Sequence, residues 1–144
     1  MVRILDKVFD GLAYAHGEGV IHRDIKPGNI FRCTNGRVKL MDFGIARAAD
    51  GTQATQTGTL RGTLDYMAPE QVRGERDVDG RCDIYALGVI LYEILTLCRP
   101  FDGKNLQQIV YEICFKEPIP LQRRNAKVPR DLVTICQKAL EKDP

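Results

Sequence analysis

The residue types with the clearest chemistry lie in two short stretches of the chain. Asp24, Lys26 and Asn29 fall close together, and Asp42-Phe43-Gly44 follows soon afterwards. Carboxylate and amide oxygens are the ligands that Mg²⁺ prefers, and a lysine ammonium can offset the charge of a phosphate. The spacing alone therefore predicts a site for a nucleotide and a divalent metal.

The segment between these stretches should bring them together. Two β-prone runs, residues 30–33 and 38–41, flank an Asn-Gly pair, which is a strong indication of a β-hairpin. The first and last residues of a hairpin lie side by side. We therefore expect Asn29 and Asp42, which flank this hairpin, to lie close together. Pro27 excludes a regular helix through the first stretch, and irregular backbone suits a site that aims several side chains at one ligand.

Apolar residues at helical spacing predict the rest of the fold. The second of the predicted helices is apolar on nearly all sides, which indicates a buried central helix. The fold class is therefore mainly α with a small β-hairpin. Residues 45–62 are rich in Thr and Gly and lack periodicity, so they predict a long mobile loop. The predicted helices cover residues 4–17, 84–98, 106–113 and 132–140, the last opened by Pro129.

Composition narrows the class of protein. The 144 residues are 44% hydrophobic and 28% charged, which is ordinary for one globular domain. A formal net charge of +2 is too balanced to indicate a nucleic-acid surface or a polybasic membrane patch. Five cysteines without a C-x-x-C pair suggest reduced, mostly buried thiols in the cytoplasm. No apolar run has the length of a membrane span or the pattern of a signal peptide.

The motifs resemble those of one enzyme family. His22-Arg23-Asp24, four spacer residues and Asn29 are similar to the catalytic loop of protein kinases, and Asp42-Phe43-Gly44 is similar to their metal-binding motif. The resemblance covers essentially the entire chain, which looks like the larger, C-terminal helical lobe of a kinase. Details of the sequence are most similar to bacterial Ser/Thr kinases of the eukaryotic type.

This resemblance implies roles for the residues of the site. Asp24 would be the base that orients a substrate hydroxyl, and Lys26 would lie against the γ-phosphate of ATP. Asn29 and Asp42 would hold Mg²⁺. Phe31 could be simple strand core, but the resemblance places it beneath the adenine ring.

The segment from Gly62 to Glu70, which ends in Ala68-Pro69-Glu70, is similar to the kinase substrate-docking loop. Within it, Thr63 would bond the catalytic aspartate and lysine. That threonine, together with the lysine two residues after the catalytic aspartate, points to Ser/Thr specificity. The implied partners are proteins with Ser or Thr acceptors.

Other residues would support the site. His22 is expected to be a packed structural residue stacked near Phe43, with Gly44 beside them. Asp83 is an ordinary helix N-cap or, as the resemblance implies, the carboxylate that supports the catalytic-loop backbone, and both roles can hold together. His16 has no evident partner in the sequence and is expected at the surface.

Thr55 and Thr57 form a Thr-x-Thr pair like the autophosphorylation site of bacterial Ser/Thr kinases, which also implies self-association. Arg23 would pair with a phosphothreonine there; the alternative is a plain flexible linker. Glu70 normally pairs with an arginine that this sequence does not contain, so it should be buried without that partner at a cost in stability.

The sequence contains no Gly-rich phosphate loop, no strand lysine and no paired helix glutamate. We therefore expect residues 1–144 to be a partial kinase domain, a C-lobe without its N-lobe, with little or no activity alone. Two alternatives remain open. One is a small-molecule phosphotransferase of the aminoglycoside type, and the other is a truncated, catalytically inactive binding module.

Overall fold

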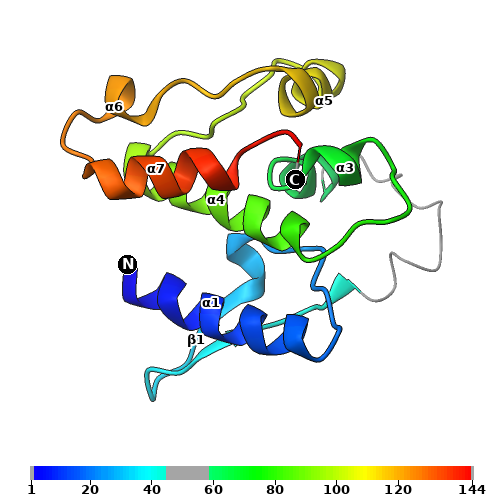
Figure 1. Ribbon diagram of the computed structural model, residues 1–144, viewed down its shortest axis with the longest axis vertical. Helices are drawn as coiled ribbons and strands as arrows, with labels where there is room; N and C mark the ends of the chain where they lie inside the picture. Colours follow the sequence, from blue (N-terminus) through cyan, green and yellow to red (C-terminus); the bar gives the residue numbers. More distant parts are fainter. Residues whose placement is uncertain (1, 45–58, 144) are drawn as a thin grey trace.

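The computed structural model describes residues 2–44 and 59–143 (Figure 1). As predicted, it is mainly helical with one small hairpin. In order, the elements are α1 (Val2–Gly17), η1 (Pro27–Asn29), β1 (Ile30–Arg32), β2 (Val38–Leu40), α2 (Thr59–Leu64), α3 (Pro69–Val72), α4 (Arg81–Thr96), α5 (Leu106–Phe115), α6 (Leu121–Arg124) and α7 (Arg130–Ala139).

Helix α4 runs through the middle of the molecule. Figure 1 shows α5, α6 and α7 on one side of it, and α1 with the hairpin on the other. Leu87, Val89 and Tyr92 are at most 2% exposed, although they point in different directions around the helix. A helix buried on all sides is the core of the domain, as the sequence predicted.

Helix α1 buries one stripe of its surface. Leu5, Val8 and Leu12 are buried at helical spacing, and the helix packs against β2. At its end the Val20 N–H donates to Ala15 O at 2.8 Å, and Gly19 has a φ of 73°, a left-handed conformation that favours glycine. The helix therefore ends where the sequence predicted, and the chain turns into the site.

The hairpin confirms the Asn-Gly prediction. Strands β1 and β2 pair antiparallel, with Phe31 opposite Lys39. Gly36 in the turn has a φ of 80°. Phe31 is 52% exposed, so the strand-core interpretation of this residue is wrong: its face of the hairpin does not lie against the helices.

Some boundaries differ from the predictions. Residues 59–62 are helical in α2, so the loop predicted over 45–62 ends earlier; residues 45–58 lie outside the described part of the chain. Helices α3 and α6 were not predicted, because four residues are too few to show a helical period. Among the described residues, none of the helices combines the length and the apolar character needed to cross a membrane.

Candidate active site

The backbone of the loop at residues 22–24 is tied to the start of α4. The Asp83 carboxylate is 1% exposed and accepts the His22 N–H at 2.9 Å and the Arg23 N–H at 2.8 Å. Arg23 has a φ of 63°, a conformation that costs a non-glycine residue about 1 kcal/mol or more. Gly80 is the N-cap of α4, so the N-cap interpretation of Asp83 is wrong, and its contacts are those of a backbone support.

His22 ties the same loop to the segment after β2. Its side chain is fully buried, its Nε2 lies 3.0 Å from Met41 O, and its ring centroid is 4.4 Å from that of Phe43. The Gly44 N–H donates to His22 O at 2.7 Å. A Cβ at Gly44 would lie 2.9 Å from that oxygen, so this close approach requires glycine.

Four predicted site residues form one cluster. Lys26 Nζ donates to Asp24 Oδ2 at 2.9 Å and to Thr63 Oγ1 at 3.3 Å. Asn29 Nδ2 donates to Asp24 O at 2.8 Å and to Asp24 Oδ2 at 3.1 Å. A carboxylate, an ammonium, an amide and a hydroxyl thus converge, although Thr63 is distant in sequence.

Asp42 stands at the other end of the hairpin. The Met41 N–H donates to Asn29 O at 2.9 Å, so the residue next to Asp42 pairs directly with Asn29. Asp42 is exposed and has a φ of 57°, a second strained residue at this site. Because Asn29 uses its amide nitrogen on Asp24, its oxygen is the atom that it can offer to a cation. An amide oxygen and a carboxylate such as that of Asp42 are donor types that fit Mg²⁺.

Helix α3 packs against the loop through Gln71, a residue that sequence reasoning missed. Gln71 Nε2 donates to Arg23 O at 2.9 Å, and its Oε1 accepts the Ala68 N–H at 3.1 Å. One amide therefore joins the catalytic-loop backbone to the start of α3. A glutamine three residues into a short helix could have suggested a capping contact, but not its second partner.

The comparisons with known proteins agree with this geometry. A family profile described as "Protein kinase domain" matches residues 1–144. The chain belongs to the protein kinase family. Serine/threonine-protein kinase PknB of Mycolicibacterium smegmatis is 46% identical over 145 residues, that of Mycobacterium leprae 44% over 144 and that of Mycobacterium tuberculosis 43% over 145, each covering 99% of this chain. The chain spans 23% of the length of these relatives.

The protein kinase family generally uses ATP and Mg²⁺. Tyr85 is 4% exposed, and its hydroxyl is the one buried side-chain polar atom without a hydrogen-bond partner among the described residues. It borders a cavity of about 200 Å³ that Glu70 also lines. Glu70 is 6% exposed, and burial raises the pKa of its carboxyl group. In residues 2–44 and 59–143, no ion pair of Glu70 is found.

The prediction for His16 is wrong. Its ring Nε2 lies 2.8 Å from Asp83 Oδ2, so the histidine is partly buried at the end of α1 and belongs to the support of the catalytic loop. No local pattern indicates this pairing, because the partner is 67 residues away.

The predicted phosphorylation sites, Thr55 and Thr57, lie outside the described residues. Their expected partner Arg23 is partly buried, and its Nη2 lies 3.4 Å from Val78 O. Its pairing with a phosphothreonine stays a prediction.

Proposed function

We propose that the protein containing this chain transfers the γ-phosphoryl group of ATP to Ser or Thr hydroxyls of proteins. The observation that carries this proposal is the cluster of Asp24, Lys26, Asn29 and Thr63, whose polar atoms lie within 3.3 Å of one another in successive pairs. The names of the relatives favour a protein acceptor over an aminoglycoside.

Asp24 acts on the reacting hydroxyl, and Lys26 acts on the phosphoryl group that is transferred to it. The Asp24 carboxylate accepts the proton of the hydroxyl and orients its oxygen for attack. The Lys26 ammonium, held 2.9 Å from Asp24 Oδ2, offsets the negative charge that develops during transfer. Thr63 holds Lys26 in this position through its hydroxyl.

The oxygen atoms of Asn29 and Asp42 would hold Mg²⁺, and the exposed ring of Phe31 would offer an apolar face to the adenine. When bound, Mg-ATP supplies the phosphoryl group. The remaining phosphate contacts of a kinase, a Gly-rich loop and a strand lysine, are absent from this sequence. We therefore assign residues 1–144 to the C-terminal lobe and expect little or no activity from this chain alone.

The five cysteines are all free thiols, as expected in a reducing compartment, and we place the kinase domain in the cytoplasm. We also propose that the protein self-associates and phosphorylates its own Thr55 and Thr57.

The test is a chimera in which the chain follows the N-terminal lobe of its relative from M. smegmatis. Incubated with Mg-ATP, the chimera should phosphorylate Ser and Thr residues of an acceptor protein and within residues 52–63. Asp24→Asn and Asp42→Asn should each lower the rate by about 100-fold or more, because each removes a group that acts in the transition state.

Asp10→Asn, at an exposed position of α1, is the matched control and should retain the rate within twofold. If Asp42→Asn were as active as the unmodified chimera, the proposed metal site would be wrong. Phosphorylation of an aminoglycoside in preference to the acceptor protein would instead support the small-molecule class.

A further inference from the structure

A dense group of cationic side chains lies on the loop around α6, which we call the basic loop (residues 120–130). All four of its charged residues are positive and exposed, and no acidic residue occurs between Glu117 and Asp131. The whole chain has a formal net charge of only +2, so the rest of the chain is net acidic. Positive charge is therefore concentrated here. The four residues are Arg123, Arg124, Lys127 and Arg130.

The backbone of the basic loop is held firmly while these side chains face solvent. Leu121 is 2% exposed and Val128 is 6% exposed, so both ends are anchored in the core. Between them, Asn125 Nδ2 donates to Leu95 O at 2.8 Å, and the Asn125 N–H donates to Leu121 O at 2.8 Å. Little backbone entropy would be lost on binding a ligand.

These cations are not used by the fold. In the part of the chain that the structure describes, none of the four forms an ion pair with a carboxylate within 4.0 Å. Arg124 does have a neighbour, because its positive charge acts to lower the pKa of the Tyr92 phenol, although burial has the larger effect and raises it. Arg123, Lys127 and Arg130 are left to act on a ligand outside the chain.

We propose that the basic loop binds an acidic segment, rich in Asp and Glu, of a partner polypeptide. Three of its four cations are arginines, whose planar guanidinium groups can bind carboxylates through two hydrogen bonds. The loop has no aromatic residue on which a nucleic-acid base could stack. Its apolar residues Leu121 and Val128 point into the core and offer nothing to insert into a bilayer.

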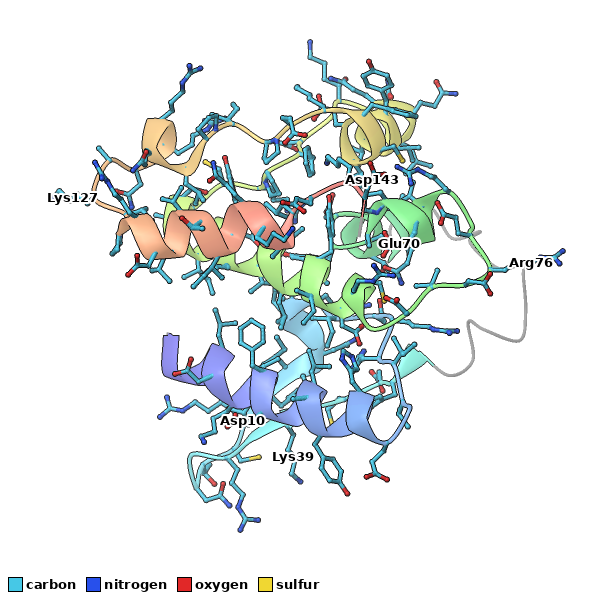
Figure 2. The ribbon with its side chains drawn as sticks, in the orientation of Figure 1. Asp10, Lys39, Glu70, Arg76, Lys127 and Asp143 are labelled. Carbon is cyan, nitrogen blue, oxygen red and sulfur yellow. The ribbon has the colours of Figure 1, made fainter. Side chains whose placement is uncertain are left out.

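The basic loop is separate from the candidate active site. Asn125 is bonded to Leu95, near the C-terminal end of α4, whereas Asp83 supports the catalytic loop at the other end of the same helix. Twelve residues at the α-helical rise correspond to about 18 Å. Figure 2 shows Lys127 on the opposite side of this view from Arg76. Binding at the basic loop therefore does not depend on phosphoryl transfer and can be measured without it.

The experiment is a fluorescence-anisotropy titration of the full 144-residue chain into a fluorescein-labelled peptide of alternating glutamate and serine. The matched peptide has glutamine in place of glutamate. The variant Arg123→Glu/Lys127→Glu reverses two charges on the loop. The control variant Lys39→Glu/Arg76→Glu makes the same change in net charge at two exposed sites elsewhere, labelled in Figure 2.

The glutamate peptide should bind, the glutamine peptide should bind at least about tenfold more weakly, and the affinity should fall with added salt. Arg123→Glu/Lys127→Glu should weaken binding by about tenfold or more, while the control variant should stay within twofold. An equal loss in both variants, or no binding by either, would overturn the proposal. Tighter binding of a single-stranded oligonucleotide or of phosphatidylserine vesicles would overturn it in favour of those ligands. Circular dichroism of both variants should match that of the unmodified chain, which checks that they are folded.

Discussion

The His16 ring Nε2 lies 2.8 Å from Oδ2 of Asp83, a carboxylate that also accepts two backbone N–H groups of the catalytic loop. One buried side chain thus joins the end of α1, the start of α4 and the loop that carries Asp24. Removing the His16 ring takes one hydrogen bond from a buried carboxylate, which is costly. The position of the His16 ring should therefore matter for stability.

Gly80→Ala tests the position of this ring. A Cβ at Gly80 would lie 2.8 Å from both Cε1 and Nδ1 of His16, closer than carbon and nitrogen atoms pack. We expect Gly80→Ala to lower the free energy of unfolding by about 1–3 kcal/mol, as overpacking does. In a His16→Ala background the same substitution should cost less than about 0.5 kcal/mol, because the clash is gone. Urea denaturation of the unmodified chain, the two single variants and the double variant measures the coupling energy between positions 16 and 80. Equal costs of Gly80→Ala in both backgrounds would contradict the predicted clash.

Two helical glycines should respond oppositely to the same substitution. A Cβ at Gly88 in α4 would lie 2.8 Å from the Ala139 Cβ of α7, whereas one at Gly11 in α1 would lie 3.8 Å from Leu40. Gly88→Ala should destabilise the chain by about 1–3 kcal/mol through overpacking. Gly11→Ala should stabilise it by about 0.5–1 kcal/mol through helix propensity. Thermal unfolding of both variants measures the sign of each change in stability. A change of the same sign in both variants would contradict the packing argument.

Tyr66→Phe tests a hydrogen bond within the segment from Gly62 to Glu70. The Tyr66 hydroxyl donates to Glu93 Oε2 at 2.8 Å, and burial, together with this bond, raises the pKa of Tyr66 to about 12. Loss of the bond should cost about 1–2 kcal/mol at neutral pH. A raised phenol pKa means that this contribution is complete below pH 10 and is lost as the pH approaches 12. Tyr111→Phe, at a residue that is 61% exposed, is the control and should change stability by less than about 0.5 kcal/mol.

Lys142→Met tests a half-buried ammonium. Lys142 Nζ donates to Ile113 O at 2.7 Å and lies 3.9 Å from the Phe101 ring centroid, yet burial lowers its pKa to about 8. Between pH 8 and the ordinary lysine pKa of 10.5, the unfolded chain therefore binds more protons than the folded one. The unmodified chain should gain stability relative to Lys142→Met across this range, by about 2–3 kcal/mol in total.

Urea denaturation at intervals from pH 7 to 10.5 measures this gain. Lys138→Met removes a lysine whose side chain is 76% exposed and controls for the loss of a surface charge. A difference between the unmodified chain and Lys142→Met that does not change with pH would show that the ammonium pays no desolvation cost.

Features encoded by local pattern were predictable, and features that depend on distant contacts were not. The hairpin and the long helices follow from an Asn-Gly turn and from apolar periods, which are local properties. The convergence of Asn29 with Asp24 follows from their spacing in one loop. His16 was misplaced and Gln71 was missed because their partners, Asp83 and Arg23, are 67 and 48 residues away.

The end of the loop predicted over residues 45–62 shows the same limit. Helix α2 has six residues and no apolar period of its own, so its sequence resembles that of a loop. The role of Asp83 was left between two interpretations for a related reason. An aspartate near a helix start is usually a cap, and only the position of Gly80 one turn earlier decides the matter.

The link between residues 22–23 and Asp83 has a consequence for biosynthesis. A nascent chain that has emerged from the ribosome only as far as α3 already contains every predicted catalytic residue, but not the carboxylate that fixes their loop. The loop must therefore acquire its shape only after α4 has emerged and packed. Hydrogen exchange on stalled chains should find the His22 and Arg23 amides unprotected until α4 is exposed, and protected afterwards.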